Sequence, residues 1–211
     1  MILLTCVKLP ESLDKSALTE ATVNAFPHPD NLAYIRDIAM RTSEKASTEG
    51  LFALTVLQRL IPLLPCPPDK STLRLRRAEG GKPYFADHPL YFNVSHSEDF
   101  VACALSDCEE VGVDIEASNP SPEQAKKIAR RFFTQEEIYN VEEDPKCFLR
   151  LWTEKEAKAK FFGKSIGNLF SEEKNNAFSP DLQEISTHFF TKQDIPITLC
   201  TKSVYSTIKF L

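Results

Sequence analysis

The sequence predicts an α+β protein that is a pseudo-two-fold duplication of two similar α+β halves. The expected elements run strand, helices and strands, and the same order then follows again. A length of 211 residues accommodates two halves of about a hundred residues each. We therefore expect an N-terminal half at residues 1–107 and a C-terminal half at residues 108–211, with the division inside residues 106–110. No residue-level repeat accompanies the shared order, so the duplication rests on the elements.

The first half opens with an apolar strand at residues 2–9. Helical patterns follow at residues 31–45 and 49–60, and leucines recur on one face of the second until Pro62 ends it. Prolines make residues 62–69 a rigid loop. Further strands are expected at residues 72–77, before a turn at 79–83, and at residues 90–94 and 100–106, on either side of the loop SHSED.

The second half begins with a strand at residues 111–116. A capping box at Ser121, with Pro122 at the first helical position, and another at Thr134 predict the starts of two helices. Asp144 and Pro145 open a third helix, which should run to about Gly163. The remaining strands are expected at residues 188–191, 197–201 and 204–210.

Composition and charge restrict the function. With 42% hydrophobic and 26% charged residues, the chain is typical of a soluble globular protein. The net charge of -5 argues against nucleic acid as a partner, because such binding needs a basic surface. The basic clusters at residues 74–77 and 126–131 therefore suit a small anion or an acidic protein.

The cysteines indicate a reducing compartment. The six cysteines are spread along the chain without a C-x-x-C pair or a histidine at zinc-ligand spacing. No basic segment precedes the short apolar opening, and no apolar run reaches membrane-spanning length. We therefore expect a cytoplasmic protein with no membrane partner.

Acidic residues share one face of the strand VGVDIE. Apolar residues alternate with Gly112, Asp114 and Glu116, so both acids project from the face opposite the core. Two residues of strand separate them by about 6.7 Å, which lets one cation draw on both. Gly112 would leave room there for a ligand. The alternative is a half-buried strand whose outer face is simply solvated.

The helix predicted at residues 145–163 adds an acid and two lysines. Lys155 lies on a mostly apolar stripe with Trp152, which we expect in the core. Glu156 and Lys160 lie at the border of this stripe, where a charge needs a partner. Taken alone, they also fit an ordinary surface pair at i and i+4. Three carboxylates with two lysines indicate phosphoryl-group chemistry.

An ordered set of motifs resembles one enzyme family. GKPYF (81–85), FNVSHS (92–97), GVDIE (112–116), RRFFTQEE (130–137) and WTEKEAKAK (152–160) together are similar to the 4'-phosphopantetheinyl transferases. The length resembles the larger, surfactin-synthetase-activating type, a monomeric pseudo-dimer with its active site between the halves. The resemblance covers about residues 77–165.

The resemblance implies a function and a set of site residues. The enzyme would transfer the 4'-phosphopantetheine group of coenzyme A to a serine of an apo acyl or peptidyl carrier protein, with Mg²⁺, and release 3',5'-ADP, which is a holo-acyl-carrier-protein synthase activity. The implied magnesium ligands, in the C-terminal half, are Asp114, Glu116 and Glu156. The implied contacts with coenzyme A are Arg41, Arg77, Gly81, Lys82, Pro83, Asn93, Ser95, His96, Asp114, Lys155 and Lys160. Arg41 also fits a plain helix-surface residue.

Glu156 and Lys160 are the expected catalytic residues. Glu156 would act as general base toward the serine, and Lys160 would stabilise the leaving phosphate. Because carrier proteins are acidic, the basic helix near residues 123–133 is a candidate docking surface, through Lys126, Lys127, Arg130 and Phe133. The rival hypotheses are a non-catalytic module that binds coenzyme A or carrier protein, and a magnesium-dependent phosphohydrolase.

Overall fold

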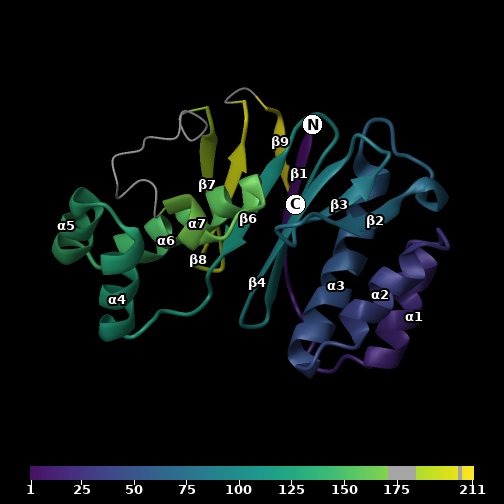
Figure 1. The fold of residues 1–211 in the computed structure, drawn as a ribbon, viewed down its shortest axis with the longest axis horizontal. Helices are drawn as coiled ribbons and strands as arrows, with labels where there is room; N and C mark the ends of the chain where they lie inside the picture. The colour runs from purple at the N-terminus through teal and green to yellow at the C-terminus, as the bar shows by residue number, and fades with distance from the viewer. Residues whose placement is uncertain (171–183, 204–205) are drawn as a thin grey trace.

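A first antiparallel sheet forms the centre of the N-terminal half. The computed structural model describes residues 1–170, 184–203 and 206–211. Strand β5 (Phe100–Ser106) pairs with β1 (Ile2–Lys8) on one side and with β4 (Tyr91–Ser97) on the other. The last strand, β9 (Ile208–Phe210), adds in parallel to the free edge of β1. The two termini therefore lie close together (Figure 1).

The second sheet repeats the pairing order of the first. Strand β8 (Ile195–Thr201) lies between β6 (Val111–Ile115) and β7 (Ser186–Lys192). Among β1, β4 and β5 of the first sheet and β6, β7 and β8 of the second, the first strand along the chain pairs with the third, and the third pairs with the second. The α+β class is confirmed. The division at residue 107 stays a prediction, and β9 crosses it because it joins the sheet of the first half.

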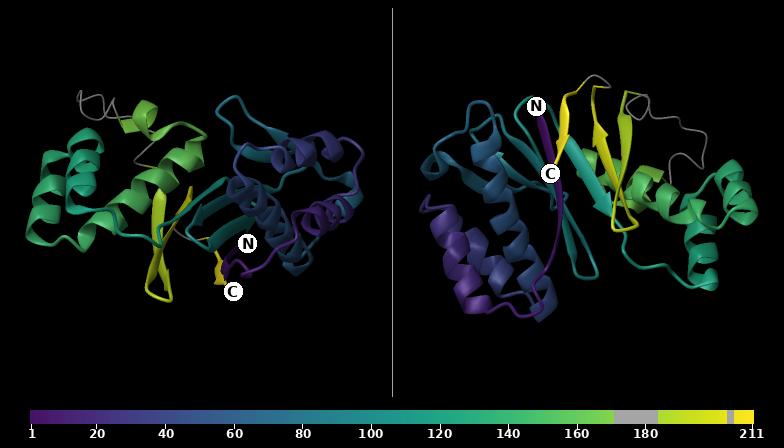
Figure 2. Two further views of the ribbon diagram at one scale, coloured as in Figure 1. Left: turned by 90° about the horizontal axis from the view of Figure 1, so that it is seen from below. Right: turned by 180° about the vertical axis from the view of Figure 1, so that it is seen from behind.

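The two sheets face each other across a shared core. Ile2, Leu4 and Cys6 of β1 pack with apolar residues of β6 and β8, whereas Leu3 packs with the helices of the first half. This alternation follows from the two-residue period of a strand. Both faces of the first sheet are consequently buried, with the helices of each half at opposite ends of the molecule (Figures 1 and 2).

The helices of the first half differ in part from the prediction. They are α1 (Lys15–Ala25), α2 (Asn31–Ala39) and α3 (Glu44–Leu60), followed by 3-10 turns at Ile61–Leu63 and Lys70–Thr72. The continuous helix expected at residues 31–45 was wrong, because Ser43 caps a new helix by accepting a hydrogen bond from the Ala46 N–H. Helix α1 was not predicted, although Asp14 caps it, because it buries little more than Leu18 and Thr22.

The strands between α3 and β5 were also misjudged. The turn expected at residues 79–83 joins β2 (Arg74–Arg77) to β3 (Pro83–Ala86), but β3 itself was not predicted. The predicted loop SHSED was largely wrong, because β4 continues through Ser97 and pairs with β5 up to that residue. Polar side chains concealed the strand, since Ser95 and Ser97 have partners outside their own sheet.

The helices of the second half follow the predicted signals. Both capping boxes form, at the starts of α4 (Pro122–Phe132) and α5 (Gln135–Glu143). Helix α6 (Cys147–Phe162) ends at Gly163, whose φ of 63° fits the left-handed position after a helix. The short α7 (Ile166–Phe170) was not predicted. The strand expected at 204–210 is β9, and residues 204–205 of that prediction lie outside the described residues.

Helix α6 crosses β6 and β8 on the face that points away from the first sheet. Thr153 of the helix and Thr198 of β8 share a hydrogen bond of 2.8 Å between their hydroxyl oxygens. None of the helices in the described residues has both the length and the apolar character that a membrane crossing requires.

Candidate active site between the two halves

A cavity of about 430 Å³ lies where the two halves meet. Strand β4 and helices α2 and α3 supply one wall, and β6 and α6 supply the other. Several predicted site residues from both halves line it together: Arg41, Arg77, Pro83, Ser95, His96, Asp114, Glu116, Glu156 and Lys160.

Side chains of β4 join the first sheet to β6. Asn93 accepts a hydrogen bond from the Val113 N–H at 2.9 Å, Ser95 donates to Asp114 at 2.8 Å, and Ser97 donates to Glu116 at 2.6 Å. Alternate residues of a strand share a face, so these three reach β6 together. The acids of β6 are thereby fixed relative to the first half.

Asp114 is buried with one oxygen satisfied and one not. The residue is 4% exposed, and its Oδ1 accepts hydrogen bonds from Ser95 and from the Lys160 ammonium, the latter at 2.7 Å. Its Oδ2 is buried and has no hydrogen-bond partner. A buried carboxylate oxygen without a partner is costly, so this atom is available for a ligand that replaces the missing contact.

Helix α6 covers the acid-bearing face of β6. Apolar and polar residues alternate along β6 as predicted. The alternative of a solvated outer face was wrong, because all five residues of β6 are buried. Gly112 makes room for the helix rather than for a ligand. A Cβ built there would lie 2.2 Å from the Ala157 carbonyl oxygen and 2.5 Å from the Phe161 nitrogen. The glycine thus permits the close approach that brings Glu156 and Lys160 to the strand.

The negative charges of this cluster repel one another. The pKa of Glu156 is raised above its ordinary value of 4.5, first by burial and then by the nearby charges of Asp114 and Glu116, while Lys160 acts in the opposite direction. Lys160 also donates to Ser95 at 2.7 Å, so its ammonium lies between the halves. The arrangement favours binding of a further positive charge.

The donor set fits a hard cation that keeps other ligands. Asp114, Glu116 and Glu156 offer carboxylate oxygens, the ligand type that Mg²⁺ prefers. Within the described part of the chain, no three acidic, histidine or cysteine side chains are close enough to enclose a metal by themselves. Water or phosphate oxygens would have to complete the shell, as is usual for magnesium.

The first half contributes Arg41, Arg77 and His96 to the cavity wall, and we call this part of the wall its basic end. Arg77 lies 4.9 Å from the centre of the Tyr34 ring, and Arg41 donates to the Ala46 carbonyl at 3.3 Å. His96 Nδ1 lies 3.2 Å from a carboxylate oxygen of Glu49. Burial lowers the pKa of His96 most, with contributions from Lys160, Arg41 and Lys45, and Glu49 opposes them.

Two residues of this basic end were not predicted. Tyr34 gave no signal beyond its place on a helix. Glu49 carried a signal that we overlooked, because a charged residue beside the buried leucines of α3 needs a partner.

Several predicted contacts with coenzyme A lie away from the cavity. Asn93 is 3% exposed and bonds to the backbone of β6. Lys82 donates to Glu110, to the Val111 carbonyl and to the Phe161 carbonyl, at 2.7, 3.0 and 2.8 Å, so it ties the hairpin to β6 and α6. Gly81 occupies the hairpin turn, with a φ of 83°. None of these three residues lines this cavity, so their contacts with coenzyme A stay a prediction.

Lys155 points to the other side of α6. It is 5% exposed, pairs with Glu137 of α5 at 3.1 Å and lies 4.4 Å from the centre of the Phe170 ring. Its expected contact with coenzyme A does not fit this position. Trp152, expected in the core, is instead partly exposed and lines the cavity.

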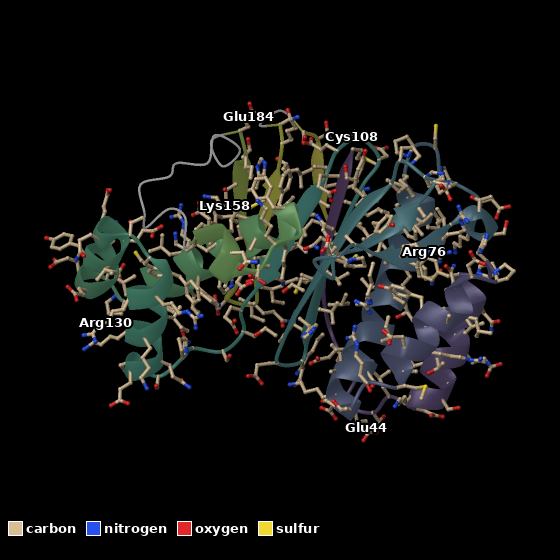
Figure 3. The ribbon with its side chains drawn as sticks, in the orientation of Figure 1. Glu44, Arg76, Cys108, Arg130, Lys158 and Glu184 are labelled. Carbon is tan, nitrogen blue, oxygen red and sulfur yellow. The ribbon has the colours of Figure 1, made fainter. Side chains whose placement is uncertain are left out.

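The basic helix α4 lies beside this site. A hollow of about 470 Å³, which shares Glu116 and Trp152 with the cavity, is also lined by Lys127. Lys126 and Arg130 are exposed, and Arg130 lies on the outer part of α4 (Figure 3). Phe133 is 1% exposed and packs on Phe148, so its predicted part in docking was wrong.

Comparison with known proteins points to one family. Residues 110–209 match the model of the 4'-phosphopantetheinyl transferase superfamily. The chain is 30% identical to 4'-phosphopantetheinyl transferase gsp of Aneurinibacillus migulanus over 79% of its own length and 68% of that protein. It is 38% identical to 4'-phosphopantetheinyl transferase Sfp of Bacillus subtilis over 46% of its own length and 45% of that protein.

A third relative matches over a similar stretch. 4'-phosphopantetheinyl transferase AcpT of Salmonella typhimurium is 40% identical over 44% of this chain and 51% of its own length. The motifs, the cavity between the halves and these relatives agree, and the chain belongs to the 4'-phosphopantetheinyl transferase superfamily, enzymes that transfer the phosphopantetheine group of coenzyme A to carrier proteins.

Proposed function

We propose that this protein is a magnesium-dependent transferase of the holo-acyl-carrier-protein synthase type, whose acceptor is a serine hydroxyl of an apo acyl or peptidyl carrier protein. The observation that supports it best is that both halves line one cavity with different charges: Arg41, Arg77 and His96 come from the first half, and Asp114, Glu116 and Glu156 come from the second. Coenzyme A carries a 3'-phosphate and a pyrophosphate. In the transfer, the serine oxygen forms a bond to the phosphorus next to pantetheine, and the phosphoanhydride bond within the pyrophosphate breaks to release 3',5'-ADP. A basic end suits one phosphate, and an acidic end suits a cation on the others.

The basic end would hold the phosphate that does not react. Arg41, Arg77 and His96 converge there from three segments of the first half. Guanidinium groups match phosphate with paired hydrogen bonds, so they bind and orient this anion well. Ser95, between the two ends, offers a hydroxyl beside Lys160.

Asp114, Glu116 and Glu156 would hold Mg²⁺, with Asp114 Oδ2 as the oxygen that still lacks a partner. When bound, the ion neutralises charge on the pyrophosphate. Glu156 accepts the proton of the attacking serine, a role that a carboxyl group with a raised pKa suits. Lys160 donates hydrogen bonds to the phosphate oxygens that gain charge as 3',5'-ADP leaves.

The decisive assay incubates the protein with coenzyme A, Mg²⁺ and an apo carrier protein. We expect a mass gain on the acceptor serine, formation of 3',5'-ADP and loss of both products with a chelator. Free phosphopantetheine without modified carrier would indicate a phosphohydrolase. Binding of coenzyme A with neither product would indicate a non-catalytic module. Either of these results would overturn the proposal.

A further inference from the structure

A buried acid borders the basic end of the cavity. Glu49 of α3 is 4% exposed, although its neighbours Arg41 and His96 line a site that suits an anion. Burying a carboxylate without a partner costs free energy, and a negative charge beside an anion site opposes ligand binding. Glu49 therefore needs a role that offsets both effects.

The geometry singles out His96 as the partner of Glu49. Oε2 of Glu49 lies 3.2 Å from Nδ1 of His96, whereas Oε1 lies 3.8 Å from the ammonium of Lys45. The Lys45 side chain is 61% exposed, so solvent screens that longer contact. With Nδ1 directed at the carboxylate, Nε2 is the ring nitrogen left for the cavity.

The next residue of α3 supports the same arrangement. A Cβ built on Gly50 would lie 2.8 Å from a methyl carbon of Ile38 and 3.1 Å from a guanidinium nitrogen of Arg41. Gly50 thus allows Arg41 to lie against the helix beside Glu49. One turn of α3 therefore arranges two of the basic side chains of the cavity.

We infer that Glu49 is a positioning residue, which fixes the ring orientation and tautomer of His96 so that Nε2 faces the phosphate of coenzyme A. This inference rests on the proposed function for its ligand. A carboxylate that accepts the Nδ1 proton keeps that proton on Nδ1 and restricts rotation of the ring. It also stabilises the imidazolium form, which can donate to a phosphate through Nε2 while it donates to Glu49 through Nδ1.

Binding of coenzyme A should then be accompanied by proton uptake. The charged groups that act on His96 are Glu49 and Lys45 of α3, Arg41 before that helix, and Lys160 of α6. Without ligand, the lowered pKa of His96 leaves the ring mostly neutral at pH 7. A phosphate at Nε2 adds a negative charge, which favours the protonated ring.

The first test needs no variant. Nitrogen-15 NMR of the histidine rings in the ligand-free wild-type protein, above the pKa of His96, should show the proton on Nδ1. A proton on Nε2 would overturn the inference whatever the enzyme does, because Glu49 would then face an unprotonated nitrogen.

The second test compares Glu49→Ala and Glu49→Gln by calorimetry with coenzyme A. We expect Glu49→Ala to bind about tenfold more weakly, the scale of one charge-assisted hydrogen bond. Glu49→Gln keeps an acceptor and should retain the Nδ1 tautomer and an intermediate affinity. Titration in two buffers of different ionisation enthalpy should show less proton uptake for both variants, while kcat at saturating coenzyme A changes little.

The matched control is Glu44→Ala, at the exposed N-terminal end of the same helix (Figure 3). It should bind coenzyme A as the wild type does. Wild-type affinity and proton uptake in Glu49→Ala would overturn the inference. If the variant does not fold, as judged by circular dichroism, the tautomer of the wild type still decides the question. A wild-type protein that transfers no phosphopantetheine would instead contradict the proposed function. The NMR result would still decide whether Glu49 fixes the tautomer of His96.

Discussion

Glu156, the proposed general base, carries an energetic cost at neutral pH. It lies near two other carboxylates, and burial and their charges raise its pKa above 4.5. A folded-state pKa above the unfolded value means that the protonated carboxyl stabilises the fold at low pH. That contribution is fully present below about pH 4.5 and is lost as the pH rises through the folded-state pKa.

We predict that Glu156→Gln abolishes transfer but raises the Tm of the metal-free protein at pH 7. At pH 4, where the carboxyl is protonated in both states, the gain should be small. Thermal unfolding followed by circular dichroism across this range measures the difference. Glu154→Gln, which removes an acid paired with Lys158 at 2.7 Å, is the control and should not raise the Tm. A variant with lower stability than the wild type at pH 7 would contradict the repulsion among the three acids.

At the scale of elements, the contact between β6 and α6 is set by a glycine. The backbone of α6 occupies the space that any larger side chain at residue 112 would need. We predict that Gly112→Ala lowers the free energy of unfolding by roughly 1–3 kcal/mol, the usual cost of overpacking. Urea unfolding measures this cost, and displacement of α6 should reduce kcat as well.

Gly167→Ala is the matched control for that change. Among the described residues outside its own helix backbone, the nearest atom to a Cβ built there is the hydroxyl oxygen of Ser165, at 4.0 Å. Alanine in a helix is also favoured over glycine, so stability should stay the same or rise. Equal effects of the two substitutions would show that the approach of α6 to β6 does not limit stability.

The hairpin of β2 and β3 is tied to α6 by Lys82. Its three hydrogen bonds join Glu110, the start of β6 and the end of α6, and the side chain is 11% exposed. We predict that Lys82→Met lowers the free energy of unfolding by about 2 kcal/mol, because buried carbonyl oxygens lose their donor. Denaturant unfolding checks this value.

Lys164→Met, at an exposed lysine just beyond α6, controls for the loss of a positive charge. In Lys82→Met, the loss of binding free energy for coenzyme A should be smaller than the loss of free energy of unfolding, because the Lys82 ammonium lies away from the cavity. A selective loss of coenzyme A binding at unchanged stability would instead show that Lys82 contacts coenzyme A directly.

At the scale of the whole molecule, a net charge of -5 coexists with a local group of exposed basic residues on α4. Helix α4 presents exposed Lys126 and Lys127 beside the hollow that adjoins the cavity. An acidic carrier protein that approaches there would bring its serine toward Glu156. Electrostatic attraction at such a rim mainly accelerates association.

We predict that the double reversal Lys126→Glu and Lys127→Glu raises the KM for carrier protein by about tenfold, with a weaker effect at high salt, and leaves coenzyme A affinity unchanged. Steady-state kinetics at two ionic strengths measures this. The double reversal Lys202→Glu and Lys209→Glu changes the net charge equally at exposed sites outside α4. If both pairs raise the KM alike, net charge and not docking at α4 is responsible.

The sequence by itself determined the local features of this protein. Three such features depend only on residues that are close in the chain, so the sequence predicts them directly: the two capping boxes, the end of α6 at Gly163 and the alternation in β6. The motif set likewise indicated the family. At the polar end of β4, the composition favoured a loop, and that prediction was wrong. The strand continues there because its backbone pairs with β5, and the sequence near β4 does not show this pairing.

Only the tertiary structure decided which charged groups face the cavity. Lys155 and Lys160 lie on one helix, yet the first pairs with Glu137 and the second with Asp114. Five positions along a helix turn their side chains about 140° apart. The packing of α6 against Gly112 of β6 decides that Lys160, and not Lys155, faces the cavity. Long-range partners also decided three other positions. Lys82 and Asn93 hold secondary-structure elements together, and Glu49 contacts His96 of the candidate site. The sequence did not reveal these partners, because they are distant along the chain.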